Sequence, residues 1–412
     1  MSAVTAAPQP AGRIAPQPWM SEPATEAVLK ALVAESGGAR FVGGCVRDAL
    51  LGRAIGDIDI ATPLVPEEVM RRLEAAGIRV VPTGLAHGTV TAVAAPRHFE
   101  VTTLRRDVET FGRHARVAFT DDWAEDAQRR DFTMNALFLD PYGNVFDPVR
   151  GLGDLLAGRV RFVGDAATRI REDVLRLLRF YRFHAHYGKG AADAEARAAC
   201  RALAALLPTL SGERVATETL KLLAAPDPLP TLRMMAEDGV LAAFLPEVRH
   251  FGRLAAVVPL EPTPDALRRL GTLLDDAAGA AASVAERLRL SNEQSDRLIA
   301  TAAPPVAVDL AGDERAQRRA FHRLGTDLYR DLVLRRAAEG GDAVRARALL
   351  ALAEAWRPLE FPLKGRDVTA LGVPAGPEIG RLLAAIAAWW EDGDFRADRK
   401  AALAELQRRV KN

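Results

Sequence analysis

Cysteine is scarce in this sequence: only Cys45 and Cys200 occur among its 412 residues. Two isolated cysteines cannot build the disulfide framework of a small secreted protein, so we expect a reducing, cytoplasmic environment. The seven histidines are scattered along the chain, and together with the two cysteines they offer none of the ligand spacings of a zinc site. These shortages exclude a disulfide scaffold and a zinc-binding module.

Long apolar runs are also missing. No run approaches the roughly 20 apolar residues that a membrane helix needs, so we expect no membrane partner. The first stretch, MSAVTAAPQPAGRIAPQPWM, is rich in Ala and Pro but has no apolar core. We therefore interpret residues 1–24 as a flexible leader and not as a signal peptide.

A strong net charge is missing as well. The formal net charge is +1, which by itself gives no sign of a nucleic-acid partner. Basic residues nevertheless bunch at 104–116, 169–182 and 315–336, and acidic residues elsewhere cancel them in the total. Because local charge decides whether a groove attracts RNA, a basic groove on a neutral protein is compatible with this sequence.

Strand and helix signals divide the chain. Residues 25–150 contain short β-rich segments bounded by Gly, Pro or charges, interrupted by helical patterns at 24–36 and 66–76. After these, Leu, Ala, Arg and Glu recur at helical spacing to the end. The pattern predicts an α+β fold with a mixed sheet and helices in the head. An all-helical neck over 151–230 and an all-helical body and tail over 231–412 follow it.

The segment GDIDIAT places two carboxylates side by side. In a strand, Asp57 and Asp59 share one face, while Ile58 and Ile60 turn toward a core. Adjacent carboxylates repel each other unless a positive group lies between them, and they suit Mg²⁺, which prefers oxygen ligands. The alternative is a solvated edge strand that carries two acids.

The segment FVGGCVRDALLG precedes the aspartates. A strand leads into Gly43 and Gly44, and Arg47 follows near the start of a helix. Tandem glycines let backbone N–H groups approach a phosphate, and an arginine can reinforce that contact. The alternative is a tight turn without a ligand. On a later strand, Glu100 has Phe99 and Val101 on its opposite face and is a candidate for a third metal-binding carboxylate; its alternative is simple surface exposure.

The segments GGCVRD, GDIDIAT, AEDAQRRDFTMNALFLD at 124–140 and REDVLRLLRFYRF at 171–183 follow one another in a fixed order. From about residue 40 to 222, this series resembles the motifs of class II tRNA nucleotidyltransferases. That family comprises the CCA-adding enzymes and bacterial poly(A) polymerases, within the polymerase-β-like nucleotidyltransferases. The resemblance implies a catalytic head with Asp57 and Asp59 as metal-binding residues and Mg²⁺ as the cofactor.

The resemblance also assigns nucleotide contacts. Gly44 and Arg47, with Gly43 beside them, match the family's phosphate contacts, and Arg130 matches a further nucleotide-binding position. The residue-level alternative for Arg130 is a salt bridge between head and neck, with Asp131 or another acid.

In the expected helix IREDVLRLLRFYRF, Asp173 and Arg176 are three residues apart and share a face. The family uses this pair as a protein template for the incoming base: the Asp accepts from the exocyclic amine of C or A, and the Arg donates to the ring. Arg179 and Arg182 resemble arginines that line the nucleotide site. An ordinary amphipathic helix with an i,i+3 ion pair is the alternative. The apolar arc that would pack into the neck comprises Val174, Leu175, Leu178 and Tyr181.

GLAHGTVTAV at 84–93 resembles the CCA-adding subset, which favours CCA addition over poly(A) synthesis within the family. The segment 104–119 is long enough for the flexible loop that switches specificity from C to A, and this length disfavours an enzyme that adds only the two Cs. The Gly-rich stretch in 362–395 resembles the tail that meets tRNA, although a helix-capping turn would explain it equally well. No His-Asp dipeptide of an appended phosphohydrolase occurs.

The expected activity is therefore untemplated addition of C, C and A to tRNA 3′ ends. We expect tRNA, CTP and ATP as partners, no DNA, and a monomer or weak dimer. A poly(A) polymerase and a non-catalytic RNA-binding module are the alternatives.

Overall fold

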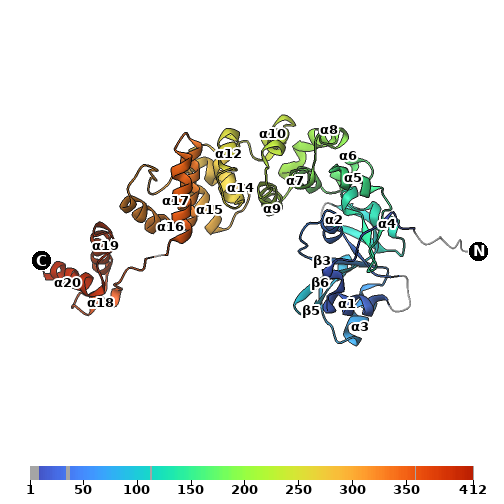
Figure 1. The fold of residues 1–412 in the computed structure, drawn as a ribbon, viewed down its shortest axis with the longest axis horizontal. Coiled ribbons are helices and arrows are strands. Elements are labelled where there is room, and N and C mark those ends of the chain that lie inside the picture. Colours follow the sequence, from blue (N-terminus) through green and yellow to red (C-terminus); the bar gives the residue numbers. More distant parts are fainter. Residues whose placement is uncertain (1–8, 34–37, 112–113, 358, 412) are drawn as a thin grey trace, which may run out of the picture. The chain divides into compact units, whose positions relative to one another are not determined.

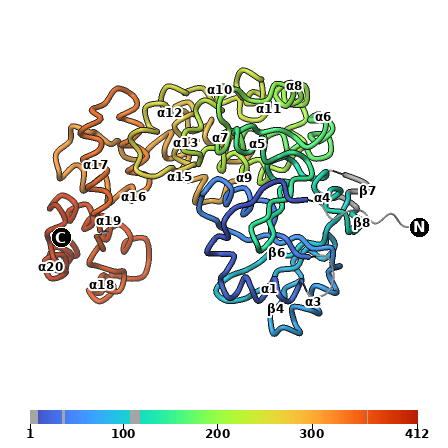
Figure 2. Tube along the Cα trace, turned by 45° about the vertical axis from the view of Figure 1, so that its right-hand side comes forward, coloured from blue at the N-terminus to red at the C-terminus, as the bar shows by residue number. Residues whose placement is uncertain are grey.

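The computed structural model describes residues 9–33, 38–111, 114–357 and 359–411. The chain forms two compact units, Met1–Pro246 and Glu247–Asn412. Figure 1 and Figure 2 colour the chain from its N-terminal, sheet-containing part to its helical C-terminal part. The expected combination of a mixed sheet in the head and a helical remainder is confirmed.

An eight-stranded mixed sheet is the centre of the head. Its strands lie in the order β1-β10-β9-β2-β3-β6-β5-β4, and β3–β6 is its parallel pair. Helices α1 (Pro23–Val33) and α3 (Pro66–Ala75) pack together and against β5. The strands are β1 (Gly12–Arg13), β2 (Arg40–Val42), β3 (Ile58–Thr62), β4 (Arg79–Gly84), β5 (Thr89–Ala94), β6 (Arg97–Thr103), β9 (Phe138–Leu139) and β10 (Asn144–Phe146).

Alternation along β3 and β6 agrees with the sequence pattern. Ile58 and Ile60 are buried, and so are Phe99 and Val101 on the neighbouring strand. In a strand, successive side chains point to opposite faces, so the acidic residues between them lie on the other face of the sheet. The hydrophobic core therefore fixes the face on which the carboxylates stand.

The expected leader is part of the head from residue 12 onward, which corrects the boundary at residue 24. Strand β1 pairs with β10, and a 3₁₀ turn spans Pro18–Ser21. Trp19 is buried with its ring 4.6 Å from that of Phe41. The Ala- and Pro-rich composition concealed this contact, because one buried tryptophan is enough to anchor a short segment. Residues 1–8 lie outside the described part of the chain.

The segment that we expected to be a flexible loop has regular structure. Strands β7 (Arg105–Phe111) and β8 (His114–Phe119) form an antiparallel hairpin separate from the main sheet. Its sequence contains β-branched and aromatic residues on both sides of a glycine at position 112, which is the usual composition of a hairpin. The tip, residues 112–113, lies outside the described residues.

The single helix predicted over 170–183 is two helices. α6 (Ala166–Glu172) ends before Asp173, whose backbone is extended with φ −149° and ψ 107°, and α7 (Leu175–Tyr187) begins after it. The Asp173 carboxylate accepts a hydrogen bond from the Leu175 N–H at 3.2 Å, so it caps the start of the second helix. The buried arc of α7 is also shifted from the prediction and comprises Leu177, Leu178, Phe180, Tyr181 and Phe183.

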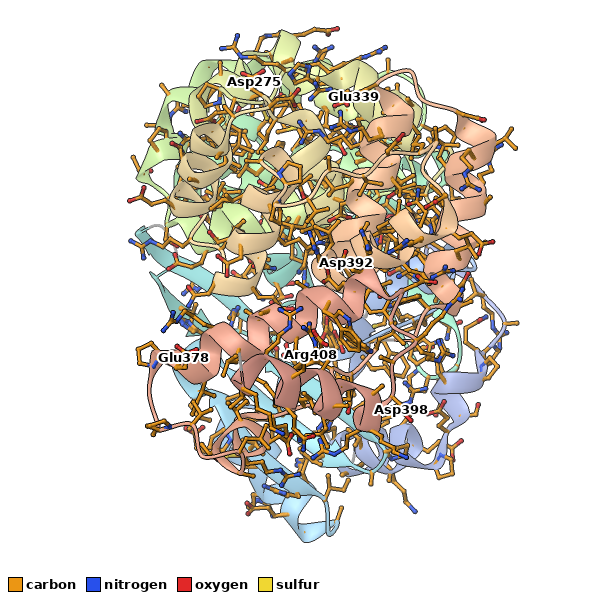
Figure 3. All side chains as sticks on the ribbon, turned by 90° about the vertical axis from the view of Figure 1, so that its left-hand side faces the viewer. Asp275, Glu339, Glu378, Asp392, Asp398 and Arg408 are labelled. Atoms are coloured by element: carbon orange, nitrogen blue, oxygen red, sulfur yellow. The ribbon has the colours of Figure 1, made fainter. Side chains whose placement is uncertain are left out.

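The remaining elements are helical. In unit Met1–Pro246 they include α4 (Trp123–Gln128), α5 (Gly151–Ala157), α8 (Ala194–Leu203), α9 (Gly212–Leu223), α10 (Leu229–Glu237) and α11 (Val240–Phe244). The second unit contains α12 (Phe251–Val257), α13 (Ala266–Leu273), α14 (Ala278–Arg287), α15 (Asn292–Ala302), α16 (Glu314–Ala338), α17 (Ala343–Ala355), α18 (Gly365–Thr369), α19 (Pro377–Asp392) and α20 (Arg399–Lys411). Figure 3 labels Glu378 and Asp392 at the two ends of α19 and Arg408 on α20. Across the described ranges, no helix is both long and apolar enough to cross a membrane.

Candidate functional site

Three carboxylates lie together at the start of β3. Asp57 directly precedes the strand, Asp59 is its second residue, and Glu100 is the register partner of Asp59 on the parallel strand β6. The expected pairing of the Glu100 strand with the aspartate strand is confirmed. Asp57 and Glu100 are exposed and Asp59 is half-buried, so the group opens to solvent on one side.

The electrostatics of Asp59 reflect this crowding. Burial raises the pKa of Asp59 to about 6, the charges of Glu100 and Asp57 push it in the same direction, and Arg130 opposes them. Two neighbouring carboxylates disfavour a third negative charge unless a cation joins them. The cluster is therefore short of positive charge.

The Gly43–Gly44 turn lies directly against Asp59. Gly43 has φ +74° and ψ −127°, a conformation that residues with a Cβ rarely adopt, and it is the residue before α2 (Gly44–Leu50). A Cβ built on Gly43 would lie 3.5 Å from Asp59 Oδ2. The glycine thus brings bare backbone next to the carboxylates, as close approach by a phosphate would require.

The side chain of Arg47 makes more hydrogen bonds within the protein than the sequence suggested. Its Nε and Nη2 donate to the Asp48 carboxylate at 3.1 and 2.8 Å, and its Nη1 donates to Asn135 Oδ1 at 2.9 Å. The guanidinium also stacks over the Tyr187 ring at 4.2 Å from the centroid, which ties α2 to α7. Of the five N–H groups of an arginine, these bonds use three, so two remain for a ligand.

Arg130 reaches the carboxylate cluster from the residues that follow α4. Its Nη2 donates to Asp126 Oδ2 at 2.7 Å, and Arg129 pairs with the other oxygen of the same carboxylate. Burial alone would raise the pKa of Asp126, but the two arginines hold it below its usual value. Arg130 therefore pairs within the head, with Asp126 four residues earlier, and this is not the salt bridge between head and neck that we considered as its alternative role.

The expected base-selecting pair does not form an internal ion pair. Asp173 accepts from Arg214 Nη2 at 3.0 and 2.8 Å, whereas Arg176 donates to Glu172 Oε2 at 2.5 Å. Arg176 also donates to the backbone oxygen of Arg129 at 3.3 Å, which brings it to the segment that carries Arg130. The ion pair between Asp173 and Arg176 is absent because the helix is interrupted at Asp173, between α6 and α7.

Arg179 and Arg182 connect α7 to other elements. Arg179 Nε donates to Asp131 Oδ2 at 2.8 Å, and Arg182 Nε donates to Glu218 Oε2 on α9 at 2.5 Å. Burial would raise the pKa of Asp131, but Arg179 and the side chain of Asn135 lower it to about 2. These two arginines therefore brace the neck in the structure as it stands.

Sequence reasoning missed the acids and the arginine that hold these groups. Glu172, Glu218 and Arg214 are engaged by residues that we had singled out, yet none of the three was a candidate. Arg214 and Glu218 lie in ERVATETLKLL, which ended the resemblance. That segment was therefore the part of the sequence from which Arg214 and Glu218 could have been identified.

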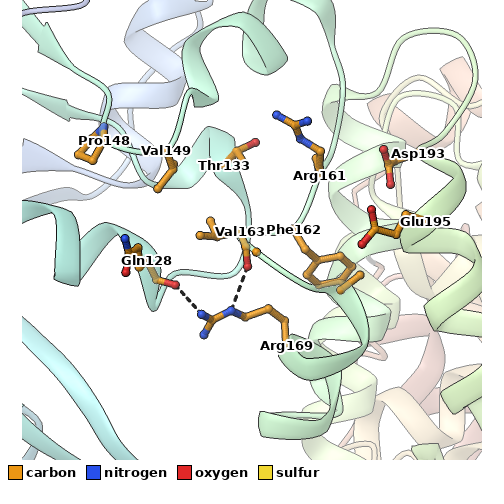
Figure 4. A pocket seen from close by; sticks show the side chains of 12 residues that line it. Gln128, Thr133, Pro148, Val149, Arg161, Phe162, Val163, Arg169, Asp193 and Glu195 are labelled. Atoms are coloured by element: carbon orange, nitrogen blue, oxygen red, sulfur yellow. Dashed lines mark hydrogen bonds between the residues drawn. The ribbon is translucent and has the colours of Figure 1, made fainter.

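A cavity of about 560 Å³ adjoins the neck side of this network (Figure 4). Arg169 lies at its edge and donates to the backbone oxygens of Gln128 at 2.7 Å and Val163 at 3.0 Å. Its Nη1 also donates at 2.8 Å to Glu172, the carboxylate that holds Arg176. Arg169 in the cavity wall and Arg176 thus share the Glu172 carboxylate.

Within the described ranges, no group of three or more His, Cys, Asp or Glu side chains is arranged to hold a metal ion. Glu100 is in register with Asp59 on β6, and its role as a third metal ligand stays a prediction. A cation at this position would take the rest of its oxygen shell from a bound substrate or water.

Comparison with known proteins agrees with this geometry. Residues 39–161 match the family model of the poly A polymerase head domain, and residues 192–251 match the model of the probable RNA and SrmB-binding site of polymerase A. The CCA-adding enzyme of Geobacillus thermodenitrificans is 42% identical over 216 residues, 52% of each chain.

Two further matches extend over nearly the whole chain. The crystal structure of the Bacillus stearothermophilus CCA-adding enzyme in complex with CTP has a TM-score of 0.72 at 29% identity and covers 95% of this chain and 98% of that one. The mitochondrial CCA tRNA nucleotidyltransferase 1 of Danio rerio is 34% identical over 381 residues, which are 89% of this chain and 86% of that protein. Similarity of this level and extent, on top of the carboxylate cluster and the glycine turn, shows that the chain belongs to the CCA tRNA nucleotidyltransferase family.

Proposed function

We propose that this protein adds C, C and A to the 3′ end of tRNA from CTP and ATP, without a nucleic-acid template. The observation that carries the proposal is the carboxylate cluster of Asp57, Asp59 and Glu100 against the Gly43 turn. It lies in a chain that aligns over most of its length with enzymes named for this reaction. The relative solved with CTP supports a nucleoside triphosphate as the ligand.

The cluster fits divalent metal ions, and we propose Mg²⁺. Asp59 is half-buried beside two other carboxylates. Burial contributes most to its raised pKa, and the repulsion by the two carboxylates that adds to it is what a divalent cation would relieve. Asp57 and Asp59 would be the protein ligands, and triphosphate oxygens would complete the shell. When bound, the cation would help to deprotonate the attacking hydroxyl and would neutralise charge on the leaving group.

The protein's own groups orient the reactants. The 3′-hydroxyl of tRNA attacks the α-phosphate of CTP or ATP, a phosphodiester forms as the α–β bond breaks, and pyrophosphate leaves. The bare backbone at Gly43 and Gly44 would admit the triphosphate next to Asp59. Arg130 would contact the developing negative charge from the other side, since it already lies near Asp59. Arg47 would donate its two remaining N–H groups to the triphosphate.

Base choice would depend on Asp173 and Arg176. An ionised Asp173 accepts from the amine of C or A and repels the carbonyl oxygen that U or G presents at that position. In the present structure its partner is Arg214, so a bound base would share or replace that bond. Glu172 would orient Arg176, and Arg179 and Arg182 would line the site from α7.

The remaining expectations stay proposals. We propose that basic helical surfaces hold the tRNA backbone by charge and shape, that DNA is not a substrate, and that the protein acts as a monomer or weak dimer. We also propose a cytoplasmic location. Several relatives are named as mitochondrial, so the same family acts in more than one compartment.

The decisive experiment uses a tRNA transcript that lacks its last three nucleotides. It is incubated with protein and Mg²⁺ and with CTP, ATP, both, or UTP and GTP, and the products are resolved on a sequencing gel. Two additions with CTP and a third only with ATP would support the proposal. A ladder of adenosines with ATP alone would assign the chain to poly(A) synthesis, as the head-domain family model allows.

Matched variants locate the chemistry. Asp59→Asn should abolish extension while leaving tRNA affinity nearly unchanged. Asp121→Asn, an exposed acid outside the cluster, should extend normally. Binding without extension in the unaltered protein would instead indicate an RNA-binding module.

A further inference from the structure

Four arginines form one face of the first half of α16, and three acids lie opposite them. We call Arg315, Arg318, Arg319 and Arg323 the arginine stripe; their spacing of three, one and four residues places them on one side of the helix. We call Glu391, Asp392 and Asp394 the acidic turn, which ends α19 and begins the connection to α20. Both groups belong to the unit Glu247–Asn412.

Each arginine of the stripe contacts the acidic turn. Arg318 binds Asp394 through two nitrogens, at 2.9 and 2.8 Å, and Arg319 Nη2 donates to Asp392 Oδ1 at 2.7 Å. Arg323 donates to Glu391 Oε2 at 2.9 and 2.5 Å, and Arg315 donates to the backbone oxygen of Asp392. Figure 3 labels Asp392 where α19 ends. The contact is a continuous row of charged pairs.

One end of each group is placed against its helix dipole. Arg315 lies in the first turn of α16, where the dipole is positive and cations are unfavourable. Glu391 and Asp392 end α19, where the dipole is negative and anions are unfavourable. A partner of opposite charge offsets these three placements.

The turn itself is held in an uncommon conformation. Asp394 and Phe395 are consecutive non-glycine residues with φ +57° and +60°. Such backbone persists only where surrounding contacts determine it. The paired arginines and the packing of Phe395 on His322, with ring centroids 5.0 Å apart, are contacts of that kind.

The tail of this unit has its own core. Leu363, Val368, Ile386, Ala402 and Leu406 form one buried cluster, and the body residues around Tyr329 and Leu349 form another. The stripe is joined to the tail by these charged pairs, by hydrogen bonds from Arg315 and Arg319 to backbone oxygens of Asp392 and Glu391, and by the packing around His322. Side chains of the stripe are still partly exposed, 33% for Arg318 and 51% for Arg323. Of the acids, Asp392 is 73% exposed, whereas Glu391 and Asp394 are 11% and 12% exposed. Salt therefore screens the Arg319–Asp392 pair most, and a stronger polyanion could begin to replace the acids there.

We propose that the arginine stripe is a binding surface for the phosphate backbone of tRNA, and that the acidic turn occupies it in the free protein. A row of carboxylates along a row of guanidiniums has the charge pattern of consecutive phosphates. tRNA would therefore displace the acidic turn, and the tail would be released from α16 when the substrate binds. This inference rests on the proposed tRNA substrate, and its tests measure binding and not nucleotide addition.

The first test compares charge-neutral variants by their Kd for a tRNA transcript without its CCA end, over a range of salt concentrations. Asp392→Asn with Asp394→Asn removes the competitor and should lower Kd about three- to tenfold at low salt. Arg318→Gln with Arg319→Gln removes two phosphate contacts and should raise Kd about tenfold, with a salt slope smaller by about 1 to 2.

Two controls change the net charge equally away from the contact. Glu354→Gln with Glu378→Gln is matched to the acid variant, since Glu378 lies at the opposite end of α19 (Figure 3). Arg347→Gln with Arg408→Gln is matched to the arginine variant. If each control shifts Kd as much as its partner, the effect is one of bulk charge and the proposal is wrong.

The second test needs no substitution. Amide hydrogen exchange of the unaltered protein, with and without the tRNA transcript, should show faster exchange at residues 391–397 and slower exchange at 315–323 when tRNA is bound. A turn that stays equally protected in the complex would overturn the proposal. Binding with displacement but without extension by CTP and ATP would refute the proposed activity and leave this inference standing.

Discussion

Without a metal ion, the folded protein disfavours the ionised form of the Asp59 carboxylate. Its carboxylate is half-buried, Glu100 lies beside it in register on β6, and Asp57 directly precedes β3. Burial and these neighbours raise its pKa from 3.8 to about 6. A folded-state pKa above the unfolded value means that the native state binds the proton more tightly, so ionisation opposes folding.

We expect the free energy of unfolding of the chelator-treated protein to fall as pH rises from about 4 to 6. Over that range Asp59 is ionised in the unfolded chain but still holds its proton in the folded protein, so raising the pH favours unfolding. After allowance for solvent screening, Asp59→Asn should stabilise the metal-free protein at pH 7 by about 1–2 kcal/mol. Urea unfolding at pH 5 and pH 7 measures this, with Asp121→Asn as control. Mg²⁺ should stabilise the unaltered protein and not Asp59→Asn; an equal response of both would contradict the metal site.

Base selection can be tested at a single carboxylate. Asp173→Asn keeps the size of the side chain but removes the charge that repels a carbonyl oxygen, so incorporation of UTP or GTP should rise by about tenfold or more relative to CTP. Triphosphate affinity should change less than base preference. Primer extension with each nucleotide measures both, and Asp342→Asn, which alters the cap of α17 in the other unit, is the control. Unchanged discrimination would exclude the template role.

Residues on one strand or turn could be assigned from the sequence, because strand alternation and the glycine pair are local rules. Asp57, Asp59 and Gly43 lie where those rules place them. The partners of the arginines could not be assigned: Asp173 meets Arg214, 41 residues away, and Arg179 meets Asp131, 48 residues away. Such contacts depend on how helices pack, which no local pattern records.

At the scale of elements, the junction between α6 and α7 connects the neck to the head. Arg176 reaches the backbone oxygen of Arg129, and Arg179 reaches Asp131 in the following segment. Arg47 stacks over Tyr187 near the other end of α7. The helix that would select the base is therefore fixed to the head along its whole length.

The Asp131–Arg179 pair should contribute to this attachment. Arg179 holds the pKa of Asp131 at about 2, so its stabilisation is present above about pH 4 and is lost as pH falls toward 2. We expect Asp131→Asn to destabilise the protein by about 2–3 kcal/mol at pH 7 and by less at pH 3. Urea unfolding of both single variants and of the double variant with Arg179→Gln should give a coupling energy of about 1–3 kcal/mol. Additive effects would show that the pair is not coupled.

Element types were easier to predict than their ends. The helical pattern over 170–183 is continuous in the sequence, and the break at Asp173 depends on its carboxylate, which accepts hydrogen bonds from the Leu175 N–H and from Arg214. The segment 104–119 was long and charged, so its hairpin pairing was not expected. In both places, hydrogen bonds outweigh the average preference of the residues.

At the scale of the whole molecule, the candidate chemistry lies within one of the two units. All the candidate site residues, from Gly43 to Arg182, and the supporting Glu218 precede the boundary at Pro246. The arginine stripe and its acidic turn lie in the other unit. Nucleotide selection and the proposed backbone contact of α16 can therefore be separated.

We expect a fragment of residues 1–246 to bind CTP with a Kd within about threefold of that of the full chain, since it keeps all the groups assigned to the nucleotide. Its affinity for the tRNA transcript should fall by at least about tenfold, because it lacks the proposed backbone contacts. Calorimetric titration with CTP and filter binding with tRNA measure the two affinities. Loss of CTP binding in a folded fragment would show that the second unit shapes the nucleotide site.

The short strand β1 covers one edge of the head's sheet by pairing with β10, and Trp19 behind it packs on Phe41. An uncovered strand edge is a template on which other chains can add strands. Removing residues 1–22 as if they were a dispensable leader would free the N–H and C=O groups of β10 and bare an aromatic surface. The shortened protein should self-associate on standing. Residues 12–22 would then protect the head from aggregation.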